Sequence, residues 1–116
     1  MDKSDIVREV LVEGLDDWVS VIALVRYSME SEPDNFEKLT SDILGELLGD
    51  GLVAVGDLGE TGFERRPGNA EDNARRVLRE LKEGSWNPPD GGCWLCNTDA
   101  GDARARLLLD APASGS

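Results

Sequence analysis

The sequence predicts a mostly helical α+β fold. Apolar residues recur at steps of three and four over five stretches, which is the spacing of one buried helical face. Two short apolar runs, at 52–55 and 93–96, stand next to glycines and indicate strands. A chain of 116 residues fits one core. We therefore expect a single domain over residues 1–110, followed by a flexible C-terminal tail over residues 111–116.

Two helices are expected at the start of the chain. The first spans about residues 3–15, where the apolar residues share one helical face. The second begins near Trp18 and is either continuous with the first or separated from it by a break at which Asp16 and Asp17 cap the new helix. We expect all three tryptophans to pack in the core, because a buried tryptophan contributes a large apolar area.

The third helix has the clearest pattern. It is expected to begin at Asp34, which with Glu37 forms an acidic variant of the capping box. The helix should end at Gly49-Asp50-Gly51, because glycine can take the left-handed conformation that terminates helices. Its apolar stripe comprises Phe36, Leu39, Ile43, Leu44, Leu47 and Leu48.

The second half of the chain predicts two short strands with a helix inserted between them. The first strand covers 52–55, with a turn at 59–62, and the inserted helix covers about 69–84. A proline- and glycine-rich loop leads to the second strand at 93–96. Thr98 can cap a C-terminal helix, whose inward side chains are expected to be Ala100, Ala103, Leu107 and Leu108.

Charge is the most unusual feature of the composition. The chain holds 24 acidic and 12 basic residues, for a net charge of −12. Residues 1–60 carry 15 acids and 4 bases, whereas residues 61–116 carry 9 acids and 8 bases. Such a field repels phosphate backbones and favours basic partners. A simpler interpretation is that the acidity only keeps a small protein dispersed.

The residue types exclude most catalytic chemistry. The sequence contains no histidine, which removes serine triads, cysteine–histidine pairs and histidine-liganded metals. No phosphate-binding glycine motif is present, so we expect neither a cofactor nor an enzyme. Cys93 and Cys96 have the spacing of half a zinc site. Ordinary buried thiols are the favoured interpretation, although four thiolates shared across a dimer, or a redox pair, are alternatives.

The expected location is the cytoplasm. The first residues lack the basic and apolar segments of a secretory signal, and two cysteines suit a reducing compartment. No apolar run approaches the roughly 18 residues of a membrane span, so we expect no membrane partner.

Two segments resemble the winged helix-turn-helix superfamily. Trp94-Leu95 followed by Thr98 and Gly101 is similar to the stretch where the wing strand of such domains enters the final helix. Residues 47–53 resemble the end of the third helix and the start of the first wing strand. The resemblance implies a winged-helix-like domain over about residues 3–109, in which Thr98 caps the last helix and Gly101 permits close packing. It also implies a short two-stranded wing, interrupted by the inserted helix.

The resemblance departs from the usual pattern at the third helix. Recognition helices of this superfamily enter the major groove beside phosphates, whereas this helix carries one lysine, Lys38, among several acids. The chain is in this respect most similar to small acidic winged-helix-like proteins of bacteria with GC-rich genomes, a group whose fold does not determine function.

The charge pattern suggests a protein-binding module that engages or inhibits a basic partner, as an immunity protein, an antitoxin or a nucleic-acid mimic does. The candidate contacts are the acids of the third helix: Glu37, Asp42, Glu46 and Asp50. Three of these are spaced four apart and therefore share one helical face. Binding would occlude the partner's surface through charge complementarity.

The alternative hypothesis is a dimeric DNA-binding transcriptional regulator. Its candidate phosphate contacts are Arg65, Arg66, Arg75 and Arg79. Glu71 and Asp72 stand four residues before Arg75 and Arg76, a spacing that favours ion pairs within the helix and lowers the charge left for DNA. A third hypothesis is an adaptor or homodimer with an apolar self-interface.

Overall fold

The computed structural model describes residues 2–88 and 92–110, and the expected tail at 111–116 lies outside these residues. The fold is α+β and mostly helical, with five helices and a four-stranded antiparallel sheet in the described part of the chain. The elements in chain order are α1 Lys3–Glu13, β1 Val19–Ser20, α2 Val21–Ser31, α3 Phe36–Gly49, β2 Val53–Gly59, β3 Gly62–Arg65, α4 Ala70–Glu83, β4 Trp94–Asn97 and α5 Asp99–Asp110.

The sheet has the strand order β1-β4-β2-β3, so the prediction of only two strands is wrong. β4 pairs with both β1 and β2, and β2 pairs with β3 through the tight turn expected at 59–62. α4 lies between β3 and β4 in the chain, as the inserted helix was expected to do. β1 was missed because a strand of two residues is too short to show alternation, and it exists only through its pairing with β4.

β1 also separates the first two helices, so they are not continuous. The predicted caps of α2, Asp16 and Asp17, are wrong because Ser20 caps the helix by accepting a hydrogen bond from the backbone N–H of Ile22. The acidic capping box of α3 is wrong as well. α3 begins after Asn35, whose side chain makes no capping hydrogen bond. Polar residues are frequent at both boundaries, so the sequence offered several candidate caps for each helix.

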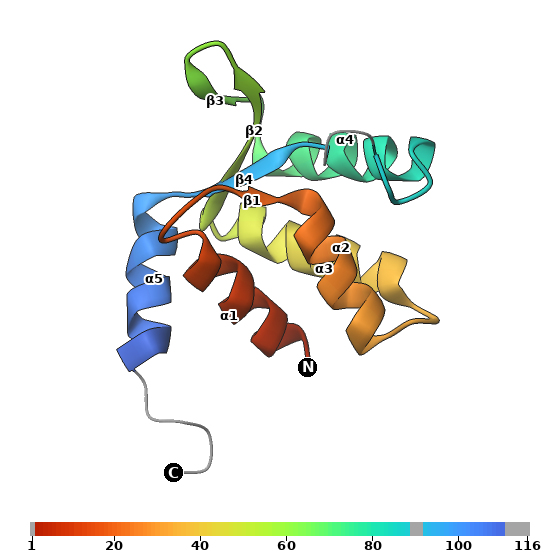
Figure 1. Ribbon diagram of the computed structural model, residues 1–116, viewed down its shortest axis with the longest axis horizontal. Coiled ribbons are helices and arrows are strands. Elements are labelled where there is room, and N and C mark those ends of the chain that lie inside the picture. Colours follow the sequence, from red (N-terminus) through yellow and green to blue (C-terminus); the bar gives the residue numbers. More distant parts are fainter. Residues whose placement is uncertain (1, 89–91, 111–116) are drawn as a thin grey trace.

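The core lies between one face of the sheet and helices α1, α2 and α3 (Figure 1), and it also includes Val77 and Leu81 of α4 and Ala105 of α5. Side chains alternate between the two faces of a strand, and those facing the helices are almost fully buried. They are Val19, Val53, Val55 and Leu95. The Tyr27 hydroxyl donates to Glu13 and ties α2 to α1. This hydrogen bond, together with burial, raises the pKa of Tyr27 to about 12.

Gly101 sets how α5 sits on the rest of the molecule. Thr98 caps α5 by accepting a hydrogen bond from the backbone N–H of Gly101, which confirms the predicted cap. The backbone N–H of Thr98 donates to the carbonyl of Leu52. A Cβ on Gly101 would overlap that same carbonyl oxygen, so this turn of α5 lies directly against the chain entering β2.

The close contact at Gly101 turns a different face of α5 inward from the one predicted. Gly101 and Ala105 are buried, and Leu108 is half-buried. The predicted inward residues Ala100, Ala103 and Leu107 are exposed, so this prediction is wrong for all three. The apolar spacing correctly grouped Ala100, Ala103 and Leu107 on one side of the helix. The close contact at Gly101, however, places a different side against the core.

Two features of the outer shape concern function. Figure 1 shows the β2–β3 hairpin extending away from the helices, and α5 standing at one edge of the molecule beside α1. None of the helices in the described residues is both long and apolar enough to cross a membrane.

The contact at Gly101 can be tested against a second helical glycine. Gly101→Ala should lower the free energy of unfolding by ~1–3 kcal/mol, because the added methyl group overlaps the Leu52 carbonyl. Gly45→Ala on α3 has open space around its Cβ and should raise the free energy of unfolding by ~0.5–1 kcal/mol. Urea titrations of both variants measure the difference, and equal effects would contradict the role given to Gly101.

Candidate functional site

The β2–β3 hairpin carries the first part of the candidate site. Leu58 and Phe63 are direct partners across the two strands, so their side chains share one face of the hairpin. The turn between them is closed by Gly59 and Gly62, and Gly62 has a φ of 109°, which favours glycine. The Leu58 side chain is 54% exposed, which leaves a large apolar group on a projecting element.

Trp18 completes the site from the loop before β1. Its ring lies 5.7 Å from the ring of Phe63, centroid to centroid, at an angle of 39°. Gly56 permits this arrangement, because a Cβ there would overlap the Phe63 ring. Trp18 is 36% exposed, and its expected place in the core is therefore wrong. We call Trp18, Leu58 and Phe63 the hairpin patch.

Acidic side chains surround the hairpin patch in sequence. Asp16 and Asp17 directly precede Trp18, and Glu60 lies in the turn. Glu64 on β3 is the cross-strand partner of Asp57 and therefore lies on the other face of the hairpin. All four are exposed, and none forms an ion pair within residues 2–88 and 92–110. The patch therefore combines exposed apolar area with carboxylates that no cation of the described chain neutralises.

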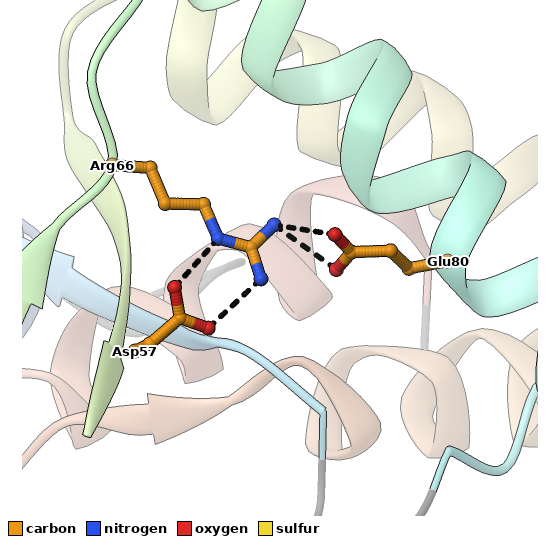
Figure 2. A network of polar contacts seen from close by, with 3 residues as sticks. All are labelled: Asp57, Arg66 and Glu80. Carbon is orange, nitrogen blue, oxygen red and sulfur yellow. Dashed lines mark hydrogen bonds and ion pairs between the residues drawn. The ribbon is translucent and has the colours of Figure 1, made fainter. Parts of the chain in front are cut away.

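Arg66 holds the base of the hairpin (Figure 2). Its Nε and one terminal nitrogen donate to the two oxygens of Asp57 at 2.9 and 2.8 Å. The other terminal nitrogen lies 3.0 Å from each oxygen of Glu80 on α4. Only 12% of the arginine side chain is exposed. We call Asp57, Arg66 and Glu80 the Arg66 clamp. It connects three parts of the chain: β2, the segment that follows β3, and helix α4.

The clamp shifts the pKa values of Asp57 and Arg66. The hydrogen bonds from Arg66 hold the pKa of Asp57 below its ordinary value, because they stabilise the carboxylate. The same hydrogen bonds, chiefly the one to Asp57, raise the pKa of Arg66. Asp57 and Arg66 are therefore both charged at neutral pH.

The clamp also bears on the predicted nucleic-acid contacts. Arg66 forms ion pairs with Asp57 and Glu80, and Arg75 pairs with Glu71 at 2.9 Å, which confirms the first of the two ion pairs expected within the helix. The expected pair of Asp72 with Arg76 is not formed within residues 2–88 and 92–110. Arg65 and Arg79 are exposed. Two of the four candidate cations are thus committed to carboxylates of their own chain.

The structure does not bring the four acids of α3 together. Glu37 and Glu46 are nine residues apart, about two and a half turns, and lie on opposite sides of the helix. Glu37 lines a groove against α4, whereas Glu46 lines a groove against α1 and α5. Asp50, at the C-terminal boundary of α3, is exposed.

Two of these acids already have lysine partners. Asp42 pairs with Lys38 at 2.9 Å, and Glu46 pairs with Lys3 at 3.2 Å. These are exposed pairs with little effect on stability, but they reduce the field that α3 presents to a partner.

The two cysteines face opposite sides of the sheet. Cys93 is buried beside Val21, Val77 and Leu81, whereas Cys96 is offset by three positions along the strand and is half-buried on the other face. Burial raises the pKa of the Cys93 thiol to about 11 and also raises that of Cys96. In the described part of the chain, no group of three or more carboxylates, cysteines or histidines is arranged to hold a metal ion.

Sequence reasoning missed the hairpin patch. Leu58 and Phe63 stand on either side of the predicted turn, and this was the one available signal that an apolar pair could lie on a projecting hairpin. The contact with Trp18 spans more than forty residues and has no local signature.

Comparison of the chain with protein-family models, curated proteins and solved structures finds no match. The candidate site therefore rests on the geometry and charge of this chain alone.

The Arg66 clamp predicts a difference between two adjacent arginines. Arg66→Ala should lower the free energy of unfolding by ~1–3 kcal/mol, because it leaves Asp57 and Glu80 without their shared cation. Arg65→Ala removes an exposed side chain and should change the free energy of unfolding by less than about 0.5 kcal/mol. Chemical denaturation at neutral pH measures both values.

The clamp also predicts a pH dependence. Because the pKa of Asp57 is lowered on folding, its contribution is present above the ordinary carboxyl pKa and is lost as the pH falls through the lowered value. The difference between wild type and Arg66→Ala should therefore shrink in acid. A difference that grows in acid would contradict the clamp.

The thiols should differ in reactivity. With a pKa of about 11 and no exposed surface of note, Cys93 should not react with Ellman's reagent at mildly alkaline pH until the protein unfolds. Cys96 is half-buried and should react first. Cys96→Ser should abolish the reaction of the folded protein with Ellman's reagent, whereas Cys93→Ser should leave that reaction unchanged. Faster reaction of Cys93 than of Cys96 in the folded protein would contradict this prediction.

Proposed function

We propose that this chain is a non-enzymatic protein-binding module that engages a basic partner through the hairpin patch. The observation that carries the proposal is the exposure of Trp18 and Leu58, beside and on a projecting hairpin. The carboxylates next to them form no ion pair among residues 2–88 and 92–110. Partly exposed tryptophan is a frequent anchor of protein interfaces, because it loses much apolar surface to a partner at little cost in conformational entropy.

The charge distribution supports a basic partner. Most of the −12 net charge belongs to residues 1–60, which include Asp16, Asp17 and Glu60. Unpaired surface carboxylates attract a cationic surface and speed its association, while the apolar patch slows dissociation once water is excluded. A phosphate backbone would meet repulsion at the same place.

The order of elements supports a winged-helix-like architecture as part of this proposal. A helix, a short strand and two helices precede β2, and β4 then returns between β1 and β2 before leading into α5. On this interpretation β2 and β4 are the wing strands, and β3 with α4 is the insertion between them. Binding by the hairpin would use the inserted part and leave α3 as a core helix.

The mode of action that suits this surface is occlusion. A module that covers a cationic active site or nucleic-acid-binding surface needs no catalytic group, and it acts by complementarity alone. Immunity proteins, antitoxins and nucleic-acid mimics act in this way, and we propose that the chain belongs to this functional class. The acids of α3 are less suited to the same role because Asp42 and Glu46 have lysine partners.

The test is capture of a partner from a lysate of the native host by the tagged chain at low and moderate salt. A basic protein should be retained by the wild type and lost by Leu58→Ser and by the double variant Asp17→Lys/Glu60→Lys. The matched control, Asp42→Lys/Glu46→Lys, carries the same charge change on α3 and should retain it. Calorimetry with the purified partner should show at least about tenfold weaker binding for the hairpin variants, about 1.4 kcal/mol.

Other outcomes would contradict the proposal. Loss of the partner by the α3 variant alone would transfer the binding surface to α3. Retention of nucleic acid that disappears in Arg65→Ala/Arg79→Ala would favour the DNA-binding hypothesis. Capture of no basic protein by the wild type would remove the support for this function.

A further inference from the structure

The outer face of α5 is apolar and exposed. Ala100, Ala103 and Leu107 follow one another at steps of three and four and therefore share one side of the helix. All three are exposed, and Leu107 is 68% exposed, the largest value among the described large apolar side chains. The helical spacing marks this as a face of the kind that helices normally bury, yet the fold buries the opposite face at Gly101 and Ala105.

The position of α5 leaves that face accessible. α5 packs on α1 and continues from β4, and it stands at the edge of the molecule, at a distance from the hairpin tip (Figure 1). We propose that α5 is a self-association surface and that two copies of this chain pair through antiparallel α5 helices.

The charges of α5 suit an antiparallel pair of identical helices. If the two-fold axis passes at Ala103, position 106 of one helix lies opposite position 100 of the other. Arg106 then reaches Asp99 of the second copy, one residue or about 1.5 Å along the axis. Arg106 and Asp99 lie on the same flank of the outer face, as a pair related by such an axis requires. The symmetry forms this ion pair twice.

The apolar contacts fit the same arrangement. With the axis at Ala103, Leu107 of each copy lies opposite the Asp99–Ala100 turn of the other, and the two Ala103 residues face each other. A large side chain thus meets small ones, which lets the helices approach closely. In a parallel pair the two-fold axis would run along the helices and place Arg106 and Asp99 of the second copy on the opposite flank, so neither ion pair could form.

Net charge also favours this surface over the hairpin patch. A chain of charge −12 repels its own copy, so association is least costly where the local charge is small. α5 contains three aspartates and two arginines, a net of −1 over its twelve residues. The hairpin patch, with its unpaired carboxylates, stays free in such a dimer, which would then offer two partner sites.

The test is the mass of the full chain by sedimentation velocity at moderate salt. The wild type should sediment as a dimer, twice the chain mass of 12.6 kDa. Leu107→Asp should be monomeric, with the dimer Kd raised at least about tenfold. The matched control is Leu109→Asp on the same helix, where Leu109 is 49% exposed and two residues, about 200° of helix rotation, away from Leu107. It should remain a dimer.

A charge exchange tests the orientation and does not depend on the leucine. Arg106→Asp should weaken the dimer, and Asp99→Arg in the same chain should restore it by re-forming the pair with reversed signs. A monomeric wild type would overturn the proposal, and so would dissociation by Leu109→Asp but not by Leu107→Asp. If circular dichroism shows Leu107→Asp to be unfolded, failure of the charge exchange to restore association is the overturning result.

Discussion

The sharing of one guanidinium by two carboxylates determines where the hairpin stands. Asp57 lies on β2 and Glu80 on α4, which are more than twenty residues apart in the sequence. Arg66 donates to Asp57 through two nitrogens and to Glu80 through its remaining terminal nitrogen. A partly buried arginine with fixed fork geometry favours one arrangement of its partners over all others. Removal of the charge would leave two carboxylates close together, so the network does more to define the geometry than to add stability.

Two glycines have a similar role through close contact. Gly56 makes room for the Phe63 ring, which in turn meets Trp18, and Gly101 lets α5 rest against the chain entering β2. At both positions a methyl group would take space that a neighbouring atom already fills. The hairpin patch and the exposed face of α5 are therefore consequences of backbone approaches, because each glycine decides which side chains are turned to solvent.

The acidity of the chain has different consequences at different places. On α3, Asp42 and Glu46 meet lysines, and on α4 Glu71 meets Arg75, so these charges are largely balanced within the molecule. Near the hairpin, Asp16, Asp17 and Glu60 have no such partner in the described chain. The net charge therefore says less about a binding surface than the distribution of paired and unpaired carboxylates does.

The sequence by itself determined the helices, the positions of β2 and β4, the turn at 59–62 and the cap at Thr98, because these depend on spacing and on residues next to one another. It could not reveal β1, the Arg66 clamp or the contact of Trp18 with Phe63. Each of these interactions joins residues far apart in the chain. It stabilises the fold only once the elements have packed together, so no local sequence pattern indicates it. The tertiary structure alone decided which apolar face of α5 is buried, since a helix with apolar residues on two sides can pack by either, and the close approach at Gly101 selects one.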